Sequence, residues 1–85
     1  MLTPVVLPEL GADADTVRVS SWLVDIGDTV EEGDRLVEVL IRGITFDVPA
    51  PSAGRLTRIE KFGESAVRAG DILGWIEALP ATESS

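Results

Sequence analysis

The chain has 85 residues, a net charge of −8 and a hydrophobic fraction of 45%, and it contains neither cysteine nor histidine. Such a composition indicates one globular domain, and it excludes disulfides, thiolate metal sites and histidine-dependent nucleophiles. The negative charge argues against nucleic acid and anionic membranes as partners. The amino terminus lacks the basic start and long apolar run of a signal peptide, so we expect a soluble, cytoplasmic protein. We also expect the protein to be monomeric in isolation.

Short β-branched and aliphatic runs between Pro, Gly and Asp predict an all-β chain, because no long stretch shows a helical stripe. We expect strands, in chain order, at residues 5–7, 16–26, 34–41, 44–48, 55–62 and 71–79. Pro4 and Pro8 confine the first strand to a sheet edge. A phase change at Ser20-Ser21 predicts a bulge in the second strand, and residues 11–15 before it form a predicted polar loop.

The stretch LIRGITF, residues 40–46, differs from its acidic surroundings because it contains no carboxylate. Only Arg42-Gly43 separates its two apolar runs, which predicts a β-hairpin with a two-residue turn. Gly43 is expected to supply a positive φ there. The hairpin tip would therefore display apolar side chains around one cation.

An internal repeat relates residues 23–39 to residues 59–76. We match Gly27 with Gly63 and Val30 with Val67, with one residue inserted in the second copy. Each copy consists of a strand, a glycine turn, a small buried valine, a Gly-Asp turn and a second strand. Two such units related by a pseudo-twofold axis predict two small sheets closed over one core.

The segments LPELG, SSWLVDIGDTVEEGDRLVEV, DVPAPSAGRL and FGESAVRAGDILGWI follow one another in an order that resembles the lipoyl (biotinyl/lipoyl attachment) domain. The resemblance is closest to the lipoyl domains of 2-oxo acid dehydrogenase acyltransferases. It implies a lipoyl-like domain over residues 1–79, with residues 80–85 as a disordered tail. The implied fold is a flattened β-barrel of two four-stranded antiparallel sheets with pseudo-twofold symmetry, a barrel-sandwich hybrid. The family carries a lipoylated lysine, which swings between active sites, at the hairpin tip.

In the family that the chain resembles, the hairpin tip usually has the sequence Glu-Thr-Asp-Lys-Ala. This chain has Leu40-Ile41-Arg42-Gly43-Ile44 at the same place. The resemblance therefore places Gly43 at the attachment position, and glycine has no side chain to acylate. Biotin attachment is not expected either. The resemblance implies the sequence Met-Lys-Met at this tip in the biotin-carrying branch of the family, and this chain lacks it. Lys61, the only lysine, lies one strand later. We therefore expect no covalent cofactor, with lipoate on Lys61 as the alternative.

The other candidate sites are interpreted as structural. Four carboxylates crowd one loop: Asp28, Glu31, Glu32 and Asp34. Their spacing does not fit an EF-hand, so we expect no metal site. Trp22 and Trp75 lie in apolar strands and are expected to be core residues or half-buried packing residues. Ser20 and Ser21 lack an activating base. No catalytic residue is predicted, and we do not expect an enzyme.

Three interpretations of the hairpin tip stay open. In the first, the lysine was lost by drift while the fold was kept. In the second, Ile41, Arg42, Gly43 and Ile44 form an exposed partner-binding contact. In the third, Ile41 and Ile44 point into the end of the barrel.

The favoured function is a non-lipoylated lipoyl-like domain that acts as a protein-binding or structural module, associated with a 2-oxo acid dehydrogenase-type complex or a ligase. The alternative is an acyl-carrier subunit of such a complex modified at Lys61. A third hypothesis is a fragment of a membrane-fusion or transport adaptor. In those proteins the similar domains are usually split at this hairpin by a helical insertion, whereas here two residues intervene.

Overall fold

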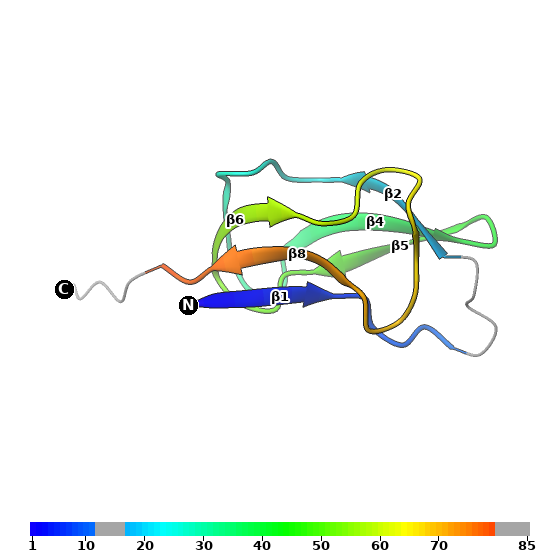
Figure 1. Ribbon diagram of the computed structural model, residues 1–85, viewed down its shortest axis with the longest axis horizontal. Coiled ribbons are helices and arrows are strands. Elements are labelled where there is room, and N and C mark those ends of the chain that lie inside the picture. Colours follow the sequence, from blue (N-terminus) through cyan, green and yellow to red (C-terminus); the bar gives the residue numbers. More distant parts are fainter. Residues whose placement is uncertain (12–16, 80–85) are drawn as a thin grey trace.

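The computed structural model describes residues 1–11 and 17–79, so most of the predicted loop at 11–15 and the predicted tail at 80–85 lie outside the described residues. This described part consists of strands and turns, and it contains no helix able to cross a membrane. The strands are β1 (Leu2–Val6), β2 (Val17–Trp22), β3 (Thr29–Val30), β4 (Arg35–Ile41), β5 (Ile44–Pro49), β6 (Gly54–Ile59), β7 (Ala66–Val67) and β8 (Ile72–Glu77) (Figure 1).

Two four-stranded sheets face each other, with strand orders β1-β8-β6-β3 and β5-β4-β2-β7. All pairs are antiparallel. Alternate side chains therefore point inward, as Val17 and Val19 do while Arg18 and Ser20 face solvent. Within the described part of the chain, the buried core contains only hydrophobic side chains: Val5, Leu7, Val17, Val19, Val30, Leu36, Val37, Val39, Val48, Ala50, Leu56, Val67, Leu73 and Ile76. The predicted fold class is confirmed.

The two halves of the chain correspond with a constant shift of 37 residues, from β2 (Val17–Trp22) to β6 (Gly54–Ile59). The Gly27 N–H donates to Leu56 O at 2.7 Å, and the Glu64 N–H donates to Val19 O at 2.7 Å. Glu64, with φ 73°, is therefore the counterpart of Gly27, with φ 101°. The expected match of Gly27 with Gly63, and the insertion it required, are wrong. A non-glycine residue has taken the left-handed position in the second copy.

The predicted bulge in the second strand is confirmed, because the register of β2 against β4 shifts between Val19 and Ser21. The equivalent shift occurs in β6 between Leu56 and Arg58. Several strand ends differ from prediction by a few residues. The expectation that Pro4 precedes the first strand is wrong, because β1 begins at Leu2 and contains Pro4, which an edge strand tolerates. The two-residue strands β3 and β7 were not predicted. The largest difference is in β2, which stops at Trp22 where we expected residue 26, because the following segment crosses between the sheets to reach β3.

Both tryptophans are half-buried and hydrogen-bonded, as expected for packing residues. The Trp22 Nε1–H donates to Lys61 O at 2.8 Å. The Trp75 Nε1–H donates to Glu60 Oε2 at 3.0 Å. The indole N–H of each tryptophan is therefore hydrogen-bonded within the chain.

Gly74 lies in the middle of β8 where two neighbours leave no room for a side chain. A Cβ there would be 2.7 Å from Arg58 O and 2.8 Å from Trp22 Cη2. The Arg58 contact is to backbone, which cannot move aside without disturbing the β6–β8 pairing. This glycine is therefore required by packing.

We expect Gly74→Ala to lower the free energy of unfolding by about 1–3 kcal/mol, because the added methyl overpacks the contact with Trp22 and Arg58. Gly63→Ala is the matched control, since a Cβ at Gly63 would meet only Ser20 O, at 3.4 Å. That variant should stay within about 0.5 kcal/mol of the parent in urea denaturation. Equal losses would contradict the close approach at Gly74.

Candidate functional site

The tip of the β4–β5 hairpin has the two-residue turn that the sequence predicts. Ile41 lies opposite Ile44, and between them Arg42 and Gly43 have φ values of 51° and 81°. Two successive positive φ values are typical of a type I′ turn. The turn lies at the end of the molecule opposite the amino terminus (Figure 1). The sequence did not show that Arg42 would also take a left-handed conformation, which is uncommon for a long side chain.

The two isoleucines beside the turn have different environments. Ile41 is half-buried and packs against the core, with Val17 of β2 opposite it. Ile44 is 70% exposed, because β5 is at the edge of its sheet and pairs only with β4 among the described strands. Among the tip residues predicted to bind a partner, Arg42, Gly43 and Ile44 are exposed and Ile41 belongs partly to the core.

Two further exposed apolar side chains lie beside the tip. Phe46 is 38% exposed and lies opposite Val39, while Leu40 is 37% exposed and lies opposite Thr45. Residues on alternate positions of a strand share a face, so Phe46 lies on the same face as Ile44. Sequence reasoning missed Phe46, because an apolar residue in an alternating run gives no signal of whether its strand is at an edge. We call Ile44 and Phe46 the apolar hairpin surface, and Leu40, opposite Thr45, points to the other face of the sheet.

Lys61 is not at the hairpin tip. It follows β6 and is half-buried, and the 37-residue shift makes it the counterpart of Val24. Its N–H donates to Leu73 O at 3.2 Å, and its carbonyl accepts the hydrogen bond from Trp22. The structure therefore does not bring the only lysine together with the predicted site.

The acidic loop residues close turns. Asp28 Oδ2 accepts a hydrogen bond from the Asp25 N–H at 2.8 Å, and Asp34 Oδ2 accepts one from the Glu31 N–H at 2.9 Å. Such carboxylates stabilise the turn by pairing with its backbone. In residues 1–11 and 17–79, no group of three or more His, Cys, Asp or Glu residues is arranged to hold a metal ion.

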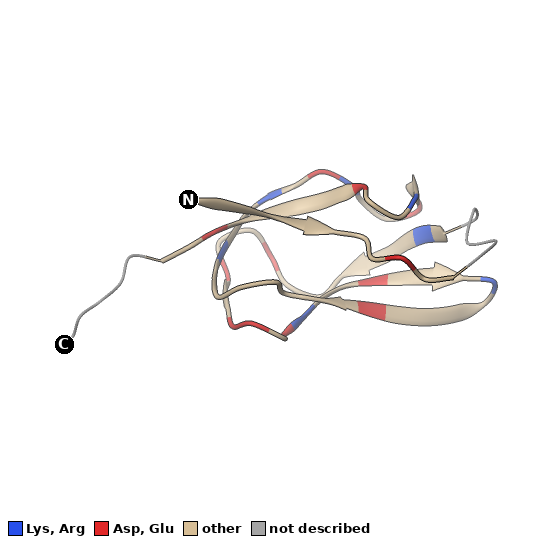
Figure 2. Ribbon diagram, turned by 90° about the horizontal axis from the view of Figure 1, so that it is seen from below, with Lys and Arg blue, Asp and Glu red and all other residues tan. Residues whose placement is uncertain are grey.

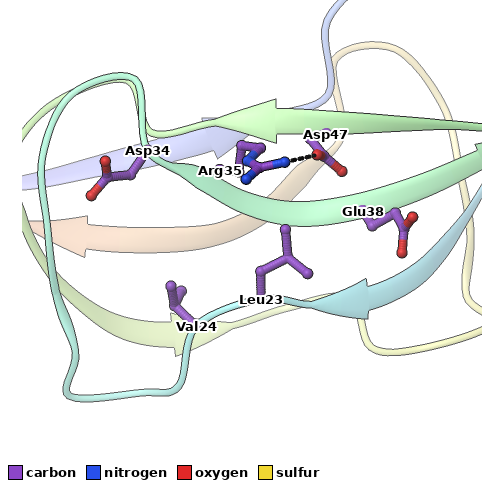
Figure 3. Close-up of a pocket in the computed structure, with 6 residues that line it drawn as sticks. All are labelled: Leu23, Val24, Asp34, Arg35, Glu38 and Asp47. Carbon is purple, nitrogen blue, oxygen red and sulfur yellow. Dashed lines mark hydrogen bonds and ion pairs between the residues drawn. The ribbon is translucent and has the colours of Figure 1, made fainter.

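An open groove of about 560 Å³ runs along the outer face of β4 and β5 (Figure 3). It is lined by Leu23, Val24, Asp34, Arg35, Glu38 and Asp47. Arg35 Nη1 lies 3.4 Å from Asp47 Oδ2, and the Arg35 side chain is 76% exposed, so this ion pair contributes little. Carboxylates beside aliphatic side chains suit binding of a cationic and apolar group, and the groove lacks a nucleophile with an activating base.

Comparisons with known proteins match nearly the whole chain. A family model described as "Biotin-requiring enzyme" matches residues 3–76. The dihydrolipoyllysine-residue acetyltransferase component of the pyruvate dehydrogenase complex of Mycobacterium tuberculosis is 37% identical over 73 residues, which cover 86% of this chain. The same component of Corynebacterium glutamicum is 33% identical over an alignment of 86 positions, which covers 95% of this chain. The chain spans 13% of the length of each of these relatives.

The fold is also similar to that of a solved structure. The lipoyl domain of the 2-oxoglutarate dehydrogenase complex from Azotobacter vinelandii matches with a TM-score of 0.69 at 20% sequence identity. The match covers 87% of this chain and 94% of that domain. The double four-stranded sheet is therefore the architecture of that domain.

The unequal burial of the two isoleucines predicts unequal costs of substitution. Ile41→Ser should lower the free energy of unfolding by about 1–3 kcal/mol, because it removes apolar contacts with the core. Ile44→Ser should change it by less than about 0.5 kcal/mol, because its side chain is mostly in solvent. Urea denaturation of the two single variants measures both. A loss at Ile44 as large as that at Ile41 would show that the hairpin packs more tightly than described.

Proposed function

The chain belongs to the family of biotin and lipoyl attachment domains, and from that premise we propose that it is a non-lipoylated lipoyl domain that binds a protein partner through its hairpin tip. Lipoyl domains are carrier modules without catalytic activity of their own, and this chain corresponds to that small module of its much longer relatives. In this domain the tip binds a partner directly and carries no acyl group.

The observation that carries the proposal is the residue at the tip. Arg42 and Gly43 make up the whole turn between β4 and β5, and Gly43 offers no amine for an amide bond to lipoate. Lys61 is held by backbone hydrogen bonds in a different loop. A ligase that acts on a lysine displayed at the tip therefore has no acceptor there.

The apolar hairpin surface supports partner binding. Ile44 is 70% exposed at the end of the turn that contains Arg42, and Phe46 extends the exposed apolar area along the same face of β5. Aromatic side chains and arginine are enriched in protein interfaces. The relatives are components of 2-oxo acid dehydrogenase complexes, so we propose a component of that type, in the cytoplasm, as the partner.

Co-expression with a lipoate ligase and free lipoate should leave the chain unmodified, because the tip presents no lysine. Intact-mass spectrometry of the purified protein measures this, and peptide mapping locates any adduct. A lipoyl increment on Lys61 would contradict the proposal and establish the acyl-carrier alternative.

The matched control rebuilds an acceptor at the tip. Arg42→Asp with Gly43→Lys restores the Asp-Lys pair of the family, and Ile41→Thr with Ile44→Ala removes neighbouring bulk. Aspartate tolerates the left-handed conformation at position 42, and replacing Gly43 costs about 1 kcal/mol, which a folded domain survives. The rebuilt protein should accept lipoate under the same conditions. If it folds and stays unmodified, this hairpin does not present its tip as the family does.

Partner binding makes a separate prediction. Ile44→Ser should weaken binding to the purified host 2-oxo acid dehydrogenase component about tenfold, the loss expected for one well-buried contact residue at an interface. Ile26→Ser is the matched control, since Ile26 is 58% exposed and lies outside the hairpin. Isothermal titration calorimetry compares the two variants with the parent. Equal affinities for all three proteins would place the contact elsewhere.

A further inference from the structure

β5 is a long and poorly protected sheet edge. In residues 1–11 and 17–79 the edge strands are β1, β3, β5 and β7. Proteins usually protect an edge by making it short, or by placing proline or charged side chains, especially lysine, in it. β3 and β7 have two residues each, and β1 contains Pro4. β5 has six residues, its one charged side chain is Asp47, and its only proline is at the last position.

The pairing with β4 shows which backbone groups of β5 are open. Ile44 closes the two-residue turn with Ile41, so these two residues exchange hydrogen bonds, and Phe46 repeats the pattern with Val39. The residues between, Thr45 and Asp47, therefore aim their N–H and C=O groups away from β4. In the described residues, no backbone hydrogen bond beyond the strand ladder involves either of them.

The pseudo-twofold relation shows how the same edge is protected in the other half of the chain. Glu38 and Trp75 are 37 residues apart and occupy equivalent positions in β4 and β8. Glu38 pairs with Asp47 of β5, and Trp75 pairs with Pro4 of β1. Asp47 is thus the counterpart of Pro4. At this position β1 lacks a backbone hydrogen-bond donor, because proline has no N–H, whereas β5 keeps the N–H of Asp47.

The side chains along the open edge differ between its two faces. Ile44 and Phe46 share one face and are exposed. On the opposite face Asp47 lies directly across from Glu38, and both line the groove (Figure 3). Acidic positions on both strands of the hairpin are seen in Figure 2. Like charges directly opposite each other destabilise a strand pair, and Arg35 offsets this only weakly.

We propose that β5 binds an extended segment of a protein partner as an additional antiparallel strand. The segment has apolar side chains beside Ile44 and Phe46, and a lysine or arginine beside Asp47. This inference rests on the proposed function and specifies how the partner binds next to the tip. Main-chain hydrogen bonds to Thr45 and Asp47 supply affinity, and the flanking side chains supply specificity. The occupant is a basic segment because a second copy of the chain would bring two charges of −8 together.

The probe is an acetylated, amidated peptide, Thr-Val-Lys-Val-Thr-Val-Thr. Aligned antiparallel to β5, it places its lysine beside Asp47, its middle valine beside Phe46 and its next threonine beside Thr45. In a titration followed by amide NMR, binding should saturate, and hydrogen exchange of the Thr45 and Asp47 amides should slow. Replacing the lysine by glutamate should weaken binding about tenfold, because an attractive charge pair becomes a repulsive one.

Two N-methylated peptides test the backbone pairing. Methylation of the threonine nitrogen beside Thr45 should weaken binding about tenfold or more, because that N–H faces β5. Methylation of the valine nitrogen beside Phe46 should change affinity less than about twofold, because that N–H points away from β5. Equal affinities of the two methylated peptides would overturn the proposal, as would the absence of saturable binding.

Variants of the protein give an independent test. Asp47→Pro introduces the proline that β1 carries at the equivalent position, and it should abolish peptide binding. Asp47→Asn keeps the N–H, so it should still bind, with the preference for the lysine peptide over the glutamate peptide reduced. Thr45→Pro tests the second open N–H and serves if Asp47→Pro does not fold. Unimpaired binding to a folded proline variant would overturn strand addition.

Two further outcomes are distinguishable. If sedimentation shows a dimer whose Thr45 and Asp47 amides are protected without peptide, the occupant is a second copy and the proposal is wrong. If strand addition fails while Ile44→Ser still weakens binding of the dehydrogenase component, the proposed function stands and only this inference is lost. If Ile44→Ser has no effect on that component, the proposed function itself fails.

Discussion

The closure of two sheets over one aliphatic core is the constraint on which the other features of the molecule depend. Every side chain that is fully buried in the described residues is hydrophobic, and most are Val, Leu or Ile. Burial of such side chains contributes about 1.5–3 kcal/mol each, before the entropy of folding is subtracted. Because inward positions alternate along each strand, the outward positions and turns vary without loss of the fold. A hairpin tip without lysine is compatible with that core.

The pseudo-twofold arrangement makes differences between the halves informative. Equivalent positions share a backbone environment, so a different residue reflects a different local requirement. Glu64 takes the left-handed conformation that Gly27 takes in the first copy, which shows that the turn does not strictly require glycine. Pro4 and Asp47 differ in what they do to a sheet edge. Pro4 removes a hydrogen-bond donor from β1, whereas Asp47 leaves the donor at the equivalent position of β5. The second difference bears on partner binding.

The tip combines a tight turn with side chains that differ from the family pattern that the sequence resembles. Arg42 and Gly43 adopt the type I′ conformation, although a left-handed arginine is less favourable than an aspartate, which the family pattern has at this position. Ile44 and Phe46 are exposed beside the turn. Exposure of these side chains along an edge strand links the two proposals. Both place the partner at the same end of the molecule.

The sequence by itself determined the six longer strands, the two-residue turn at Arg42-Gly43, the bulge near Ser20 and the family, because alternation, turn residues and motif order are local patterns. The strands β3 and β7 were not predicted, because two residues show no alternation. Only the tertiary structure decided that Ile41 packs inward while Ile44 does not, since that depends on which strand has a neighbour on both sides. The counterpart of Gly27 was misassigned for a related reason. A glycine in the sequence does not report its φ, and the pairing partners that impose it are distant in the chain.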